Sequence, residues 1–246
     1  MTLLRRAATL ALPLAIAGLT LAGCDKAKSD KEFGDKVRAY LLAHPEVLIE
    51  ANQKLQEKQA ALQAASAEKA IGQYRQAIER DPRDVVINPA GTLTVTEFFD
   101  YRCGYCKRAA PEIVELVQKN PDIRLVLKDF VIFGQDSEAA ARLALGAKDQ
   151  GKSLELYKAM MAENALDAAG ALRIAAGLGV DLTKTKAAGE SQAVSQHLAD
   201  TQALAKTLAL QGTPAFIVGD TLVPGADMAA LKLAIEQTRA SRAKAG

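Results

Sequence analysis

The sequence predicts an α/β domain that carries an inserted group of helices and follows an amphipathic helical stalk. Three observations lead to this fold class. A strand pattern at 93–99, a helix pattern at 102–119 and a strand pattern at 123–132 form a βαβ unit. The next stretch, 134–211, shows helix patterns interrupted by glycines. Leucines spaced seven residues apart precede the domain, in 33–82.

The amino terminus has the pattern of a secretory signal. Arg5 and Arg6 are followed by an apolar run over 7–21 and then by small residues, which predicts a removable segment over 1–23. The run Leu21-Ala22-Gly23-Cys24 resembles the cleavage box of bacterial lipoproteins, and this resemblance implies that Cys24 becomes the lipid-bearing first residue. Two alternatives stay open: an ordinary signal with an incidental cysteine, and a membrane anchor, although the run is shorter than the ~20 residues of a spanning helix.

Charge offers no argument for nucleic-acid binding. The chain has 31 Lys and Arg residues against 29 Asp and Glu residues, and removing 1–23 takes away two arginines and no acid, which leaves 29 against 29. A nearly neutral mature chain without a basic stripe is not expected to bind nucleic acid. Export also brings the chain into an oxidising compartment, where Cys103 and Cys106 are the two thiols left after lipidation of Cys24.

Between the signal and the domain, the sequence predicts a tether and a helical stalk. Residues 24–32 are charged and unpatterned, as in a flexible tether. From Phe33 the pattern is helical, and Asp81-Pro82 ends it. Leucines with heptad spacing follow one side of this stalk: Leu41, Leu48, Leu55 and Leu62. The spacing predicts that the stalk associates with copies of itself, and the alternative is that its apolar stripe folds back onto the main domain.

The main domain, 83–246, is predicted element by element from its hydrophobic periodicity. The strands are expected at 85–87, 93–99, 123–132, 215–218 and 221–223. The helices are expected at 102–119, in about five short pieces over 134–211, and at 227–242. A strand, a helix and a strand of these lengths predict a parallel pair with a right-handed connection. The whole order resembles a thioredoxin-like domain with an inserted helical subdomain.

The pair Cys103 and Cys106 predicts redox chemistry. The two thiols, separated by Gly104-Tyr105, lie where a buried strand gives way to a helix, so they can close and open a small disulfide ring. Cys103 is expected in the first helical turn, where free N–H groups and the helix dipole favour its thiolate. Cys106, one turn deeper, is expected to resolve the mixed disulfide that Cys103 forms. Three nearby basic side chains are expected to add positive charge: Arg102, Lys107 and Arg108.

Metal binding is the alternative chemistry for two cysteines at this spacing. Zinc needs four ligands, and the sequence has no second cysteine pair. The two histidines, His44 and His197, fall in separate helical segments and are expected to be surface or packing residues. Two thiolates alone can hold Cu(I), so a copper-binding lipoprotein stays a minor alternative. The preferred interpretation requires no metal and no organic cofactor.

Two segments resemble the DsbA-like periplasmic thiol–disulfide oxidoreductases. Their active-site segment is similar to Thr96-Glu97-Phe98-Phe99-Asp100-Tyr101-Arg102-Cys103-Gly104-Tyr105-Cys106-Lys107, and their cis-proline loop is similar to Gly212-Thr213-Pro214-Ala215-Phe216. The resemblance covers about 84–240 and implies a cis peptide bond before Pro214. It also implies which residues contact an extended substrate: Gly104, Tyr105, Thr213 and Pro214.

The resemblance extends to two charged residues near the cysteines. Glu97, six residues before Cys103, matches a buried acid that manages the proton of the resolving thiol, and Lys128 on the neighbouring strand matches a lysine that partners this acid. Burial raises the pKa of a carboxyl group, and a nearby ammonium group lowers it again. For each residue, the alternative is an ordinary charge at a strand end that reaches solvent.

The details of the motifs favour the isomerase or reductase branch of this family. Gly104-Tyr105 and Thr213 look more like the DsbC type than like the oxidase branch, and the stalk resembles the oligomerising helices of ScsC-type lipoproteins. The resemblance implies a homo-oligomer, lipid-anchored on the periplasmic side of a bacterial membrane, which acts on unfolded or misoxidised exported proteins and is kept reduced by a membrane electron donor. A dithiol oxidase served by an electron acceptor is the alternative. Asp25 resembles the signal that retains lipoproteins in the inner membrane.

Overall fold

The computed structural model describes residues 22–245, with side chains from residue 30 to residue 244. The chain divides into two units, Met1–Gln59 and Ala60–Gly246, and the boundary falls inside the predicted stalk. The predicted signal lies outside the described residues as far as residue 21, and the side chain of Cys24 also lies outside them. Among residues 22–245, none of the helices is both long and apolar enough to cross a membrane.

The described part of the first unit is helical. Helix α1 (Ala22–Ala43) is followed by the start of α2 (Glu46–Glu79), and the break falls at His44 because the residue before a proline disfavours the helical conformation. Helix α1 includes 24–32, which the sequence predicted as an unpatterned tether. Ion pairs one helical turn apart, such as Lys31 with Asp35, support this helix. The heptad leucines of α2 are exposed: Leu48, Leu55 and Leu62.

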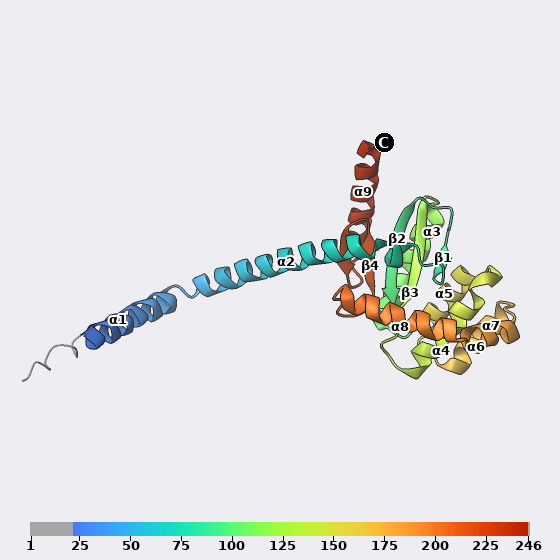
Figure 1. The fold of residues 1–246 in the computed structure, drawn as a ribbon, viewed down its shortest axis with the longest axis horizontal. Helices are drawn as coiled ribbons and strands as arrows, with labels where there is room; N and C mark the ends of the chain where they lie inside the picture. Colours follow the sequence, from blue (N-terminus) through green and yellow to red (C-terminus); the bar gives the residue numbers. More distant parts are fainter. Residues whose placement is uncertain (1–21, 246) are drawn as a thin grey trace, which may run out of the picture. The chain divides into compact units, whose positions relative to one another are not determined.

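The second unit is built on a five-stranded sheet with the strand order β1-β3-β2-β4-β5 (Figure 1). The strands are β1 (Val85–Ile87), β2 (Leu93–Phe99), β3 (Ile123–Asp129), β4 (Ala215–Val218) and β5 (Thr221–Pro224). Strands β2 and β3 are parallel, as predicted, and the other neighbours are antiparallel. Every residue of β2 and β3 is buried, which explains why both sequences are rich in apolar residues along their length.

Strand β3 ends three residues earlier than the sequence predicted, because the carboxylate of Asp100 takes the backbone donors that follow. Its Oδ2 accepts the N–H groups of Ile132 and Phe133 at 2.8 and 3.2 Å. Its Oδ1 accepts the N–H of Arg102 and the hydroxyl of Ser137, both at 2.7 Å. Asp100 therefore holds the end of β2 against the beginning of the helical insertion.

Helices cover both faces of the sheet. Helix α3 (Gly104–Lys119) connects β2 to β3, and α9 (Met228–Ala245) ends the described chain. The insertion consists of α4 (Gln135–Ala147), the 3₁₀ turn Lys148–Gln150, α5 (Ser153–Ala162), α6 (Ala168–Gly177), α7 (Leu182–Gly189) and α8 (Gln192–Thr207). Figure 1 shows α4 to α7 gathered beside the sheet, with α8 in orange leading back toward β4. Side-chain caps at Asp167, Asp181 and Ser191 start the last three of these helices.

The two faces of the sheet carry separate apolar clusters. Phe99 faces α3, α5 and α9, and packs in the larger cluster with residues such as Ile113. Its neighbour Phe98 points to the opposite face, where the smaller cluster includes the carboxyl end of α8. Ile71 and Ile78 of α2 belong to this smaller cluster and are buried. The last turns of the stalk helix are therefore part of the core of the second unit.

Candidate redox site

Cys103 and Cys106 lie at the beginning of α3. Cys103 is the N-cap residue, in an extended conformation, and Cys106 lies in the first turn. Both residues are buried, with exposed fractions of 2% and 0%. When protonated, the Cys103 thiol donates to the backbone oxygen of Thr213 at 3.2 Å. The Thr213–Pro214 peptide bond is cis, as predicted. The fold thus brings together the two sequence segments that carry the family resemblance.

The pKa of Cys103 is lowered to about 5. The largest cause is a hydrogen bond from the Cys106 thiol; the side chain of Thr213 and the N–H groups of Cys106 and Tyr105 add to it and outweigh burial, which acts in the opposite direction. The two N–H groups are the free donors of the first helical turn, as the sequence predicted. At neutral pH the Cys103 sulfur is therefore a thiolate.

The basic side chains expected to stabilise this thiolate are engaged elsewhere. The Lys107 ammonium donates to two backbone oxygens at the end of α5, at 3.2 and 2.6 Å. The Arg108 guanidinium lies 4.0 Å from the ring centre of Tyr105, and Arg102 forms an ion pair with Asp136 at 3.3 Å. Neutral hydrogen-bond donors are consequently the main cause of the low pKa of Cys103. The sequence had predicted an additional contribution from the basic side chains, and in this the structure differs from the prediction.

Cys106 has the opposite environment. Burial raises its pKa well above the usual value of a thiol, and the hydrogen bond to Cys103 and the negative charge of Glu97 raise it further. At neutral pH the site therefore combines one thiolate with one thiol. The Cys103 sulfur is already the nucleophilic thiolate, whereas the Cys106 sulfur must lose its proton before it can attack.

Glu97 is fully buried on β2, close enough to Cys106 for its charge to act on that thiol. Its Oε2 accepts a hydrogen bond from the Tyr157 hydroxyl at 2.9 Å, and its Oε1 is buried without a hydrogen-bond partner among the described residues. Burial raises the pKa of Glu97 to about 8; the Tyr157 hydrogen bond lowers it and the charge of Cys103 raises it. The carboxyl group can therefore both take and release a proton near neutral pH.

Lys128 does not partner Glu97, and this prediction is wrong. Lys128 pairs in register with Phe98, the residue after Glu97, and successive side chains of a strand point to opposite faces of the sheet. The Lys128 ammonium lies 2.7 Å from Asp84 Oδ2, in a buried cluster with His197, whose Nε2 lies 3.1 Å from Asp84 Oδ1. Lys128 is thus a buried structural cation on the far face of the sheet.

An apolar groove of about 520 Å³ opens beside the cis-proline loop. Three of the four residues predicted to contact substrate line it, namely Tyr105, Thr213 and Pro214, whereas Gly104 is not among its lining residues. The rest of the wall comes from α2, the end of α8 with the segment after it, and strands β4 and β5. Tyr105 is 60% exposed, so a bound chain can reach it.

Sequence reasoning missed two residues whose contacts shape the site. Tyr157 was part of a helix pattern in the insertion, and no local signal indicated that its hydroxyl would reach Glu97, which lies 60 positions earlier. Asp100 stood inside the active-site segment, and its four acceptor contacts became visible only with the fold. Within the described part of the chain, no group of three or more His, Cys, Asp and Glu side chains is arranged to hold a metal ion.

Two segments of the chain match known families. Residues 94–236 match the family described as DSBA-like thioredoxin domain. Residues 31–61 match the family described as copper resistance protein ScsC N-terminal domain. The first match covers both cysteines, most of the sheet and the helical insertion, and the second lies in α1 and α2.

Solved structures resemble the chain over most of its length. BcfH of Salmonella enterica Typhimurium is 30% identical, with a TM-score of 0.72 over 89% of this chain and 99% of that one. A thioredoxin-like oxidoreductase from Silicibacter pomeroyi DSS-3 is 40% identical, with a TM-score of 0.63 over 67% of this chain and 97% of that one.

Curated relatives are much longer. Over 143 residues the chain is 29% identical to the Na(+)/H(+) antiporter NhaA 3 of Salinispora tropica, which is 56% of this chain and 22% of the antiporter. The chain therefore spans about a fifth of the length of the curated relatives it matches.

Proposed function

The chain belongs to the family of DSBA-like thioredoxin domains, and we propose that it is a thiol–disulfide oxidoreductase that works through Cys103 and Cys106. One observation carries the proposal: of the two thiols at the beginning of α3, hydrogen bonds lower the pKa of Cys103, whereas burial raises the pKa of Cys106. A thiolate is the attacking species in disulfide exchange, and a protonated second thiol waits to resolve the product.

The exchange proceeds in two steps. The Cys103 thiolate attacks one sulfur of a substrate disulfide, a mixed disulfide forms, and the other substrate sulfur leaves as a thiolate that takes a proton from water. Cys106 then transfers its proton to the Glu97 carboxylate and attacks the Cys103 sulfur. A Cys103–Cys106 disulfide forms, the substrate leaves as its second thiolate, and two electrons have passed from the protein to the substrate.

We propose that the chain acts mainly as an isomerase or reductase. Gly104-Tyr105 and Thr213 support this direction through their resemblance to the isomerase branch. An isomerase must be kept reduced, which calls for an electron donor in the membrane. The alternative is an oxidase, and the low pKa of Cys103 agrees with it as well, because a stabilised thiolate makes the disulfide form more oxidising.

The proposed substrates are unfolded or misoxidised exported proteins. The apolar groove beside Thr213 and Pro214 supports this class, because an unfolded chain exposes apolar side chains that a folded protein buries. Few charged side chains line the groove, so it can bind polypeptide segments of many different sequences. Broad recognition is what a general disulfide catalyst requires.

Self-association through the stalk is part of the proposal. The heptad leucines of α2 are more than half exposed in the single chain, as expected for a seam that needs a partner: Leu48, Leu55 and Leu62. The match of residues 31–61 to the ScsC N-terminal domain family adds support. Several active sites held in one assembly let a second site capture a disulfide that the first has opened.

We propose a location on the periplasmic side of a bacterial membrane, with a lipid on Cys24 after removal of 1–23. The lipobox-like run before Cys24 supports this anchor. Incorporation of labelled palmitate in cells, abolished by Cys24→Ala, is the expected result. A wild-type chain that takes up no label would remove the anchor and leave the redox proposal standing.

Catalysed reduction of insulin tests the redox activity, and refolding of scrambled ribonuclease tests isomerisation. We expect both activities in the wild-type chain and neither in Cys103→Ser. The steady-state redox form in cells separates the two directions, because an isomerase is found reduced and an oxidase is found oxidised. A chain that binds Cu(I) but reduces no insulin would instead support the copper-binding alternative.

A further inference from the structure

The insertion contributes one side chain to the chemistry of the cysteines. Tyr157 of α5 is fully buried, and its hydroxyl donates to Oε2 of Glu97 at 2.9 Å. The two residues belong to different layers of the domain, since Glu97 lies on the sheet and Tyr157 on the inserted helices. This contact is where the insertion reaches the carboxyl group next to the resolving thiol.

Tyr157 is the hydrogen-bond donor that the described residues offer to Glu97. From the neighbouring strands, Leu127 on β3 and Phe216 on β4 are paired with Glu97, and neither can donate. The Tyr157 hydroxyl lowers the pKa of Glu97 and the charge of Cys103 raises it. The charge of Glu97 in turn raises the pKa values of Cys106 and Tyr101. One oxygen of the carboxyl group is thus held, while Oε1 stays without a partner.

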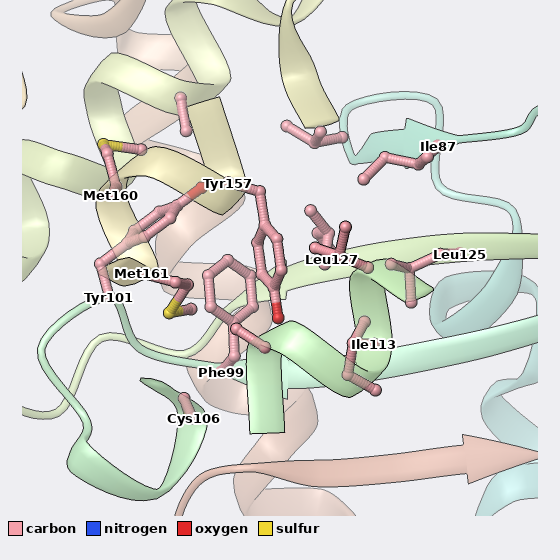
Figure 2. Close-up of a cluster of buried hydrophobic side chains, with 14 of the residues drawn as sticks. Ile87, Phe99, Tyr101, Cys106, Ile113, Leu125, Leu127, Tyr157, Met160 and Met161 are labelled. Carbon is pink, nitrogen blue, oxygen red and sulfur yellow. The ribbon is translucent and has the colours of Figure 1, made fainter. Parts of the chain in front are cut away.

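The ring of Tyr157 is held in place by its packing. It meets Phe99 edge to face, with ring centres 5.6 Å apart, and lies 6.5 Å from the ring of Tyr101. Figure 2 shows these rings in one cluster with Met160 and Met161, and Cys106 beside it. Burial and the charge of Glu97 hold the pKa of Tyr157 well above its usual value, so the hydroxyl keeps its proton and remains a donor.

We propose that Tyr157 is a positioning residue for proton transfer: it fixes Oε2 of Glu97 and leaves Oε1 as the oxygen that exchanges a proton with Cys106. The inference rests on the proposed redox function. When Cys106 attacks the mixed disulfide, its S–H proton moves to Glu97 and its sulfur bonds to Cys103. When a donor thiolate later opens the Cys103–Cys106 disulfide, Cys106 leaves as a thiolate and takes the proton back.

Tyr157 also determines how often Glu97 is ready to act as a base. With a pKa of about 8, about a tenth of the carboxyl groups are ionised at pH 7. A hydrogen bond to the charged form lowers the pKa, so its loss in Tyr157→Phe raises it. For a charged acceptor we expect a rise of about one pH unit, which reduces the ionised fraction at pH 7 about tenfold.

The test follows the release of two chromophores from 5,5′-dithiobis(2-nitrobenzoate) by the reduced full-length chain. Attack by Cys103 releases the first thionitrobenzoate, and attack by Cys106 on the mixed disulfide releases the second. For Tyr157→Phe we expect a second step about tenfold slower at pH 7, with the inflection of its pH–rate profile about one pH unit higher. The first step should keep its wild-type rate, and Tyr101→Phe is the matched control, because Tyr101 packs in the same cluster without a hydrogen bond to Glu97.

Two further variants isolate the path through Glu97. In Glu97→Gln the inflection should disappear, and adding Tyr157→Phe should change nothing more. If Tyr157→Phe does not fold, 3-fluorotyrosine at position 157 serves instead, because its more acidic hydroxyl strengthens the hydrogen bond and should move the inflection down.

The outcomes distinguish the inference from the function on which it rests. A Tyr157→Phe profile that superimposes on the wild type, or an equal effect in the Glu97→Gln background, would overturn the positioning role alone. A wild-type chain that releases no second thionitrobenzoate would overturn the proposed redox function itself.

Discussion

Glu97 and Lys128 lie on adjacent parallel strands but on opposite faces of the sheet, because Lys128 is paired with Phe98 and Glu97 with Leu127. An acid and a base that look like partners in the sequence are therefore separated by the sheet itself. Glu97 faces the cysteines in apolar surroundings, and Lys128 faces Asp84 and His197. The two buried charges accordingly have different consequences, one for proton transfer and one for stability.

Lys128→Met should destabilise the fold without changing the thiols. The substitution leaves Asp84 buried beside His197 without its cation, and removal of one member of a buried ion pair costs about 3–5 kcal/mol. Urea unfolding should show this loss, and Lys128→Met combined with Asp84→Asn should recover part of it. A change in the titration of Cys103 in the single variant would contradict the assignment of Lys128 to the far face.

Cys103 should titrate with a midpoint near pH 5 in thiolate absorbance and in the rate of alkylation by iodoacetamide. The folded pKa lies below the value of about 8.5 for an unfolded cysteine. The thiolate therefore stabilises the reduced protein fully above about pH 8.5, and this contribution is lost as the pH falls through 5. Cys106→Ala, which removes the largest cause of the shift, should raise the midpoint. An unchanged midpoint in that variant would show that the inner thiol does not stabilise the outer one.

Thr213→Val should raise the pKa of Cys103 by about one pH unit, because the isosteric side chain removes the hydroxyl that stabilises the thiolate. The buried Thr213 hydroxyl has no hydrogen-bond partner among the described residues, so its loss should cost little elsewhere. Thr213→Ser keeps a hydroxyl and is the control, with a midpoint close to the wild type. Equal midpoints in both variants would assign the effect to the backbone alone.

Deletion of residues 33–59 should yield a monomer that keeps insulin reduction and loses most isomerase activity. The longer deletion, of 33–80, removes nearly the whole predicted stalk. It also removes Ile71 and Ile78, which are buried in the core of the second unit. Each of these side chains contributes about 2–5 kcal/mol against alanine, so the longer deletion should unfold at lower urea concentration. Sedimentation checks the assembly. A 33–59 deletion that stays oligomeric would show that the leucine seam does not hold the copies together.

Local patterns in the sequence were sufficient to predict the secondary-structure elements and the reactive cysteine pair. The strand, helix and strand around Cys103 and the hairpin after Pro214 lie within a few residues of where the sequence predicts them. These features depend on contacts between residues a few positions apart, such as capping, periodicity and the first turn of a helix. The chemistry of the two cysteines follows largely from that local geometry.

The tertiary structure decided which side chains surround the pair. Strand register separated Lys128 from Glu97, because a shift of one residue moves a side chain to the other face of a sheet. The packing of the insertion brought Tyr157 to Glu97, and His197 to Asp84. Each of these contacts joins residues tens of positions apart, and the hydrophobic pattern of either segment alone carries no information on which distant partner it will meet.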